Sequence, residues 1–370
     1  MKSRNAQSMA EEMTLFSLSD VRCLSNMLMP SFSQSQRHHR SRSHLPFMFT
    51  LALLSAIALT ACCLPALAAP TSRLPPEAGR DQELFDGHRA LRELHRLVRR
   101  GNRYYGAPRR EEIIQLFESR LRAYGAETVR QRFEAEERQS GIRYTLTNII
   151  GRITPPRPQR IVLGTHWDTR LWAEEEPDPT RRAEPIPGAN DGTSGIVVLF
   201  ELARVLKRAP LRHIGVDIAL FDGEEFGRPR SRDYCVGSKH MAAELSSLYA
   251  RPPRAVIVID MVGDKDLSFP AERSSLTHAP RLEALVRRAG RAVGARAFDT
   301  TARGPWITDD QTPFQRLGIP SILLIDYEYP FWHTQQDTPD RCSAESLAQT
   351  GQALLATLRM LDRSASRARP

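Results

Sequence analysis

Short runs of aliphatic and β-branched residues recur along this chain, and polar turns separate them. Runs of this kind, bounded by glycine, proline or charged residues, are typical of strands that a sheet buries on both faces. The pattern predicts an α/β fold with strands at residues 127–133, 143–150, 160–164, 214–220, 255–260 and 318–325.

Apolar residues spaced three and four apart indicate amphipathic helices around these strands. Gly125 follows one of them and is well placed to end it in the left-handed conformation. Residues 171–187 instead carry several prolines among charged residues, so we expect a surface loop there. The expected helices cover residues 82–100, 109–124, 196–206, 237–249, 281–293 and 344–361.

The N-terminal region has the layout of a secretory signal, because arginines and histidines precede the apolar run 45–61. Residues 59–62 resemble a bacterial lipobox, in which Cys62 would carry the lipid, whereas residues 66–68 offer an ordinary cleavage site. We expect an exported protein. It is either a lipoprotein of the periplasm or cell envelope, which contacts the membrane through its lipid anchor, or a secreted protein. The expected organisation is a leader at 1–61, a linker at 62–80 and a catalytic domain at 81–364.

The charge and the cysteines narrow the class of protein. The formal net charge is +9, but the positive charge of the body is almost all arginine and is scattered, which argues against a nucleic-acid partner. The body contains only Cys235 and Cys342, and the absence of paired spacing argues against cysteine-ligated zinc. These two cysteines either form one disulfide or are separate buried thiols.

Histidine and carboxylate side chains follow the ends of the predicted strands, where ligands gather in open α/β sheets. Taken alone, an adjacent pair of glutamates fits an exposed acidic loop, but the recurrence of such side chains at several strand ends favours a metal. Imidazole and carboxylate without thiolate suit zinc in a catalytic site. The candidate residues are His166, Asp191, Glu224, Glu225, Asp260 and His333.

Asp168 stands two residues after His166. Metal-bound histidines usually donate their second ring N–H to a carboxylate or a carbonyl. We therefore expect Asp168 to accept that N–H and to fix the tautomer of His166.

A set of short motifs occurs in order between residues 80 and 362. They are His166-Trp167-Asp168, Ala189-Asn190-Asp191-Gly192, Asp222-Gly223-Glu224-Glu225, Ile259-Asp260-Met261, Asp309-Asp310 with Pro313-Phe314, Gly318-Ile319-Pro320 and Trp332-His333-Thr334. As a set they resemble the zinc aminopeptidase and glutaminyl cyclase superfamily. The resemblance implies a single globular α/β domain with a mixed, mostly parallel central sheet flanked by helices.

Two branches of that superfamily imply different metal content. In the aminopeptidases, two zinc ions share the residue that matches Asp191. The residues that match Glu225 and His333 complete the coordination of one ion. Those that match His166 and Asp260 complete the coordination of the other.

In the cyclases, a single zinc ion keeps the matches to Asp191, Glu225 and His333. The remaining acidic residues form a hydrogen-bonded network, which corresponds here to Glu224, Asp260 and Asp309.

Trp332 and the Asp309-Asp310 pair resemble the cyclase branch, and residues 166–192 look like the bacterial cyclases. Two departures stand out: Gln311 occupies a position where relatives commonly carry histidine, and the loop after Glu225 lacks the tryptophan of the animal cyclases. The resemblance implies a glutaminyl-peptide cyclotransferase that converts the N-terminal glutamine of peptides or proteins to pyroglutamate and releases ammonia. One zinc ion is expected, or two if the protein is an aminopeptidase.

In the cyclase interpretation, Glu224 takes a proton from the substrate amine and returns one to ammonia. Asp260 and Asp309 hold the proton network, and Trp332 forms a wall for the substrate side chain. Two alternatives stay open: a dinuclear zinc aminopeptidase that hydrolyses N-terminal residues, and an inactive binding module that keeps the same fold.

Overall fold

The computed structural model describes residues 84–153, 157–231 and 233–367. The predicted leader (1–61) and linker (62–80) lie outside these ranges and stay predictions. Among the described residues, no helix is both long enough and apolar enough to cross a bilayer.

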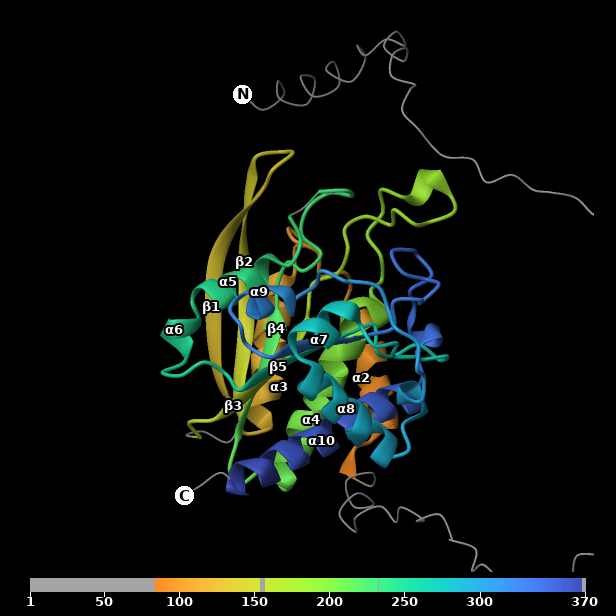
Figure 1. Cartoon of the computed structure of the whole chain (residues 1–370). Coiled ribbons are helices and arrows are strands. Elements are labelled where there is room, and N and C mark those ends of the chain that lie inside the picture. Colours follow the sequence, from red (N-terminus) through yellow and green to blue (C-terminus); the bar gives the residue numbers. More distant parts are fainter. Residues whose placement is uncertain (1–83, 154–156, 232, 368–370) are drawn as a thin grey trace, which may run out of the picture. The chain divides into compact units, whose positions relative to one another are not determined.

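A mixed six-stranded sheet forms the centre of the described domain (Figure 1). Its strand order is β1-β2-β4-β3-β5-β6, in which β4, β3, β5 and β6 run parallel and the β1-β2 hairpin joins β4 in antiparallel orientation. This confirms the mixed, mostly parallel sheet. The strands are β1 (Glu127–Glu137), β2 (Ile142–Ile153), β3 (Arg160–His166), β4 (Gly215–Phe221), β5 (Ala255–Asp260) and β6 (Ser321–Ile325).

Helices cover both faces of this sheet (Figure 1). Helices α2, α3, α4, α8 and α10 pack on one face, and α5, α6 and α9 pack on the other. The helices are α2 (Gly87–Val98), α3 (Arg110–Ala123), α4 (Gly195–Arg208), α5 (Val236–Ala243), α6 (Leu245–Leu248), α7 (Arg273–His278), α8 (Pro280–Ala292), α9 (Thr312–Arg316) and α10 (Ala344–Arg367).

The two-sided burial explains the continuous apolar runs of the sequence. In β3, Ile161 and Leu163 belong to the cluster under α4 and α10, whereas Val162 belongs to the cluster under α5 and α9. Successive strand residues point to opposite faces, so a strand covered on both faces is apolar at consecutive positions.

Several predicted elements differ from the structure in their bounds, and two of the differences have a clear cause. The helix expected at 237–249 is divided at Glu244 into α5 and α6. The hydroxyl and the backbone N–H of Ser247 both donate to the Glu244 carbonyl, at 2.7 and 3.1 Å, and such local bonds compete with a continuous helix. The strands of the hairpin run further than expected, to Glu137 and Ile153, because they pair along their full length.

A buried ion pair ties β3 to β4. Arg160 Nε donates to Asp217 Oδ2 at 2.7 Å, and the two side chains are 11% and 0% exposed. Because both charges have left water, each depends on the other for compensation.

We expect Asp217→Asn to lower the free energy of unfolding by about 3–5 kcal/mol, since it leaves the Arg160 guanidinium buried without its anionic partner. Glu112→Gln is the matched control, because Glu112 pairs with Arg109 on the open surface. It should leave the urea midpoint unchanged. Urea unfolding monitored by circular dichroism gives both midpoints. Equal midpoints for the two variants would contradict the stabilising role of the buried pair.

Candidate metal centre

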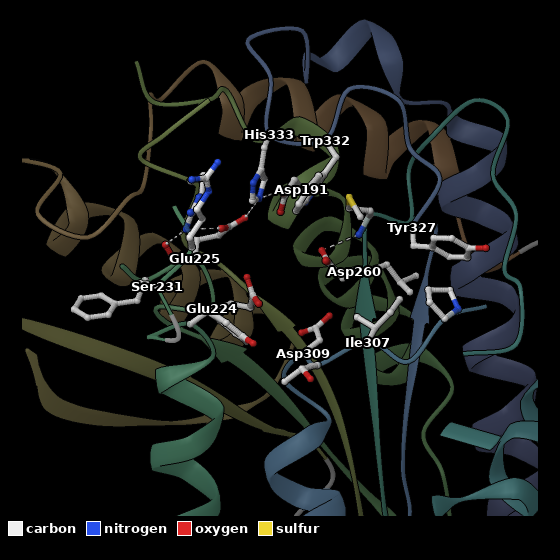
Figure 2. A pocket seen from close by; sticks show the side chains of 18 of the residues that line it. Asp191, Glu224, Glu225, Ser231, Asp260, Ile307, Asp309, Tyr327, Trp332 and His333 are labelled. Carbon is white, nitrogen blue, oxygen red and sulfur yellow. Dashed lines mark hydrogen bonds and ion pairs between the residues drawn. The ribbon is translucent and has the colours of Figure 1, made fainter. Parts of the chain in front are cut away.

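The carboxyl ends of the parallel strands meet at one edge of the sheet, where a cavity of about 420 Å³ opens. Figure 2 shows carboxylates from several elements pointing toward one another in this cavity, with His333 and Trp332 along its rim. The acidic residues that line it are Asp191, Glu224, Glu225, Asp260 and Asp309.

One group of candidate ligands consists of Asp191, Glu225 and His333, all buried and with donor atoms within 4.8 Å of one another. His333 Nε2 lies 3.1 Å from Glu225 Oε1 and 3.6 Å from Asp191 Oδ2. His333 itself has a left-handed backbone (φ 52°), which is uncommon for a residue other than glycine.

A second group shares Asp191 and adds His166 and Asp260, again with donor atoms within 4.8 Å. His166 Nε2 lies 3.1 Å from Asp191 Oδ1 and 3.1 Å from Asp260 Oδ1. The two groups contain all the candidates from the sequence except Glu224, and they share Asp191.

The chemistry of these donors fits zinc. Burial raises the pKa of Asp191 well above its usual range, and the neighbouring Glu225 charge adds to this effect. Asp191 Oδ2 is buried and makes no hydrogen bond to a described residue. A divalent cation would satisfy this oxygen and offset the negative charge, and imidazole with carboxylate is a zinc donor set.

An irregular turn, η2 (Ala189–Ser194), places Asp191 at the centre of the site. Gly192 is left-handed there (φ 88°), and a Cβ on it would lie 2.9 Å from His166 Cε1, so only glycine fits. The buried carboxylate of Asp337 accepts the backbone N–H groups of Asn190 (2.8 Å) and Asp191 (3.1 Å). The turn is thus held by a side chain outside the ligand groups.

Asp168 differs from its predicted role. Its Oδ1 is 3.6 Å from His166 Nδ1, beyond hydrogen-bond distance, and that nitrogen has no hydrogen-bond partner among the described residues. Asp168 instead accepts the backbone N–H groups of Glu224 (3.2 Å) and Glu225 (3.1 Å). Because the turn after β4 aims two donors at it, this carboxylate orients the glutamate pair rather than the histidine.

Glu224 and Glu225 diverge from that turn. The left-handed Gly223 (φ 70°) makes the turn, and a Cβ on it would lie 2.5 Å from Val236 Cγ2. Glu225 points to His333, whereas Glu224 forms a separate group with Cys235 and Asp309. The two glutamates therefore contribute to different parts of the cavity.

Burial and like charges favour the protonated forms of the carboxyl groups around Glu224. Desolvation, followed by the Glu225 and Asp309 charges, raises the pKa of Glu224 well above its usual range. Burial, then the Asp260 and Asp310 charges, raises the pKa of Asp309 in the same direction. Burial also raises the pKa of Asp310 to about 7.

Cys235 stays a thiol in this surrounding. Burial raises its pKa well above the usual range, and its Sγ lies 3.2 Å from Glu224 Oε1, which accepts its hydrogen bond. Cys342 is also a free, buried thiol. Within the described ranges these two cysteines are separate thiols, and the alternative of a disulfide between them is wrong.

Trp332 and Gln311 occupy different surroundings. The Trp332 ring is 43% exposed, lines the cavity and stacks on His333 with ring centroids 3.9 Å apart. Gln311 is fully buried, does not line the cavity and donates from its amide to the Ile307 carbonyl at 3.1 Å. Gln311, which stands where relatives commonly carry histidine, therefore belongs to the buried layer behind the cavity and not to the cavity wall.

The sequence analysis missed two residues that support the ligands, Arg170 and Glu174. Glu174 Oε1 lies 3.1 Å from His333 Nδ1, and Arg170 Nη2 donates to the same oxygen at 2.7 Å. Arg170 Nη1 also donates to the Glu225 carbonyl at 3.1 Å. Their spacing of four residues was visible in the sequence, but only the fold shows that both face the metal centre.

A third missed residue is Arg103, which is almost fully buried behind the site. It donates from Nε to the Trp167 carbonyl and from Nη2 to the Thr193 hydroxyl, each at 2.7 Å. Burial lowers its pKa to about 10, and the nearby charge of Asp168 opposes that change. No sequence motif marks this arginine.

Residues 148–358 match the sequence profile of peptidase family M28. The glutaminyl-peptide cyclotransferase of Bothrops jararaca is 26% identical over 272 residues, which cover 64% of this chain and 72% of that protein.

Two solved structures are similar over most of the chain. The glutaminyl cyclase of Fimbriiglobus ruber has a TM-score of 0.71 and 31% identity, and the match covers 75% of this chain and 95% of that one. A Zn-dependent exopeptidase from Parabacteroides distasonis has a TM-score of 0.70 and 30% identity, with coverages of 73% and 97%. Similarity thus extends to proteins of both activities.

We expect Glu174→Gln to weaken zinc binding by about 10- to 100-fold, because His333 loses the carboxylate that orients its ring. Glu184→Gln is the matched control, since this exposed glutamate of the same loop pairs only with Arg181 among the described residues. Competition against a chromophoric chelator measures both affinities. Unchanged affinity in Glu174→Gln would exclude the supporting role.

Proposed function

This chain belongs to peptidase family M28, and on that premise we propose that it is a zinc-dependent glutaminyl-peptide cyclotransferase. Its substrate is the N-terminal glutamine of a peptide or protein, and its products are pyroglutamate and ammonia. The observation that carries this proposal is the Glu224–Asp309 pair, whose carboxylates lie within 4.8 Å of each other beside the metal ligands.

Two carboxylates this close cannot both ionise without a large electrostatic cost, which favours one proton shared between them. Burial acts in the same direction, because it raises the pKa of Glu224 and of Asp309. Glutamine cyclisation requires a proton carrier of this kind, since the attacking amine must lose a proton and the departing nitrogen must gain one.

The reaction forms one bond and breaks one. The α-amine nitrogen attacks the γ-carbonyl carbon to close a five-membered lactam, and the bond from that carbon to the amide nitrogen breaks. Asp191, Glu225 and His333 would hold a zinc ion, which would supply Lewis-acid polarisation of a carbonyl group. Glu224 accepts the proton of the amine and donates one to the leaving nitrogen, so that neutral ammonia departs.

The remaining pocket residues position the substrate and the proton. Burial and the charge of Asp260 raise the pKa of Asp309, which favours a proton shared among the carboxyl groups beside Glu224. Trp332 provides a flat apolar wall beside His333, on which the glutamine side chain can lie. No water is consumed in the lactam reaction, so an apolar wall also favours cyclisation over hydrolysis.

A dinuclear aminopeptidase is the second candidate function. The group formed by His166, Asp191 and Asp260 favours it, because these donors suit a second metal ion. Glu224 would then activate a water molecule rather than the substrate amine.

We also propose that the protein acts after export, in the periplasm or cell envelope, because residues 1–61 have the layout of a secretory leader. Mass spectrometry of the mature N-terminus from the native host tests this, and an uncleaved, unlipidated N-terminus would contradict it.

We expect Glu224→Gln to lower kcat for ammonia release by about 10²- to 10⁴-fold, because the proton carrier is lost, while zinc stays bound. Glu225→Gln makes the same chemical change at the next residue and should remove zinc instead. Ammonia release and metal content, measured on both variants, separate the two roles. Loss of zinc from Glu224→Gln would contradict our assignment.

The wild-type protein should release ammonia and a lactam in equal amounts from a peptide that begins with glutamine. Chelation should stop the reaction, and one zinc ion per chain should restore it. Mass spectrometry of the products distinguishes the candidates: free N-terminal glutamine without lactam, with two metal ions per chain, would select the aminopeptidase.

A further inference from the structure

A second cavity, of about 670 Å³, adjoins the metal-centre cavity. Arg230 and Trp332 line both cavities, so the two share a wall. Much of the remaining lining comes from the proline-rich loop 171–187, including Trp172 and Arg182. The reaction described above makes no use of this space.

The loop that builds the second cavity is held firmly. The backbone N–H of Ala173 donates to the Arg182 carbonyl at 3.0 Å, and Arg182 Nε donates to the Glu176 carbonyl at 2.7 Å. The Glu176 carboxylate accepts the backbone N–H of Gln335, two residues after His333, at 2.8 Å. The wall of the second cavity is therefore fixed relative to the metal centre.

The second cavity carries an excess of positive charge. Arg182 and Arg230 are exposed and form no ion pair with an acidic residue of the described ranges. Of the two acidic residues in the lining, Glu174 is already compensated by Arg170, which leaves Glu175. Two guanidinium groups against one carboxylate favour an anionic ligand, and the planar guanidinium is suited to carboxylates.

The backbone at Arg230 supports a binding role. Its φ is 66°, a left-handed conformation that is uncommon outside glycine and costs free energy. Residues held in this way cluster at ligand sites. Here the conformation belongs to the residue that lies between the two cavities.

We propose that the second cavity binds the peptide residues that follow the N-terminal glutamine, and that it favours an acidic side chain among them. This inference rests on the proposed cyclotransferase function. A peptide whose first residue occupies the metal-centre cavity has to continue past Trp332 and Arg230, the boundary that the cavities share. Its backbone then lies between the two tryptophans, and its carboxylate meets Arg182 and Arg230.

The test compares C-terminally amidated peptides, so that a side chain is the only carboxylate. Gln-Ala-Glu-Ala-amide should have a kcat/KM about 3- to 10-fold higher than Gln-Ala-Gln-Ala-amide, through a lower KM, as expected for partly exposed ion pairs. The preference should disappear in the double variant R182Q/R230Q. It should also disappear at about 0.5 M salt, where exposed charges are screened.

Arg181→Gln is the matched control, because Arg181 belongs to the same loop but pairs with Glu184 and does not line the cavity. It should keep the preference. Equal kcat/KM for the two peptides in the wild type, or a preference that survives in R182Q/R230Q, would overturn the proposal.

Glutamine amide has no following residue, so it distinguishes a failure of the proposed subsite from a failure of the proposed cyclotransferase function. If wild-type protein releases ammonia from glutamine amide but shows no acidic preference, the subsite alone fails. If neither glutamine amide nor any of the peptides yields ammonia, the cyclotransferase function and the subsite fail together.

Discussion

The concentration of carboxylates at one buried edge of the sheet is the constraint on which the rest of the site depends. Parallel strands bring their carboxyl ends to one edge, and within each ligand group there the donor atoms lie within 4.8 Å of one another. Like charges so close, and away from water, need a cation, shared protons or directed donors. The site offers a means for each: two candidate metal-ligand groups, raised pKa values at Glu224 and Asp309 that favour a shared proton, and backbone N–H groups aimed at Asp168 and Asp337.

The proline-rich loop 171–187 lies between the metal-ligand candidates and the second cavity. On its inner side, Glu174 contacts His333 and shares a hydrogen bond with Arg170, which also reaches the Glu225 carbonyl. On its outer side, the same loop lines the second cavity. Hydrogen bonds within the loop, from Ala173 to Arg182 and from Arg182 to Glu176, hold these two sides together.

Much of the fold was predictable because burial leaves a strong pattern in the sequence. The strand at 255–260 has the predicted bounds. The helix predicted at 196–206 corresponds to α4 (Gly195–Arg208) and differs by only a few residues at its ends. The prediction failed where local hydrogen bonds decide, as at Glu244, where Ser247 divides the predicted helix. Hydrophobic periodicity does not register a hydroxyl that competes for a backbone carbonyl.

The sequence by itself determined the strands, the ligand residue types and their order, because apolar runs and the motifs at their ends are local features. Only the tertiary structure decided which partners these side chains have. Asp168 accepts the backbone N–H groups of Glu224 and Glu225. Glu174, together with Arg170, supports His333, which lies far away in the sequence. Hydrogen bonds depend on distances of a few tenths of an ångström between segments far apart in the chain, and no local pattern encodes such distances.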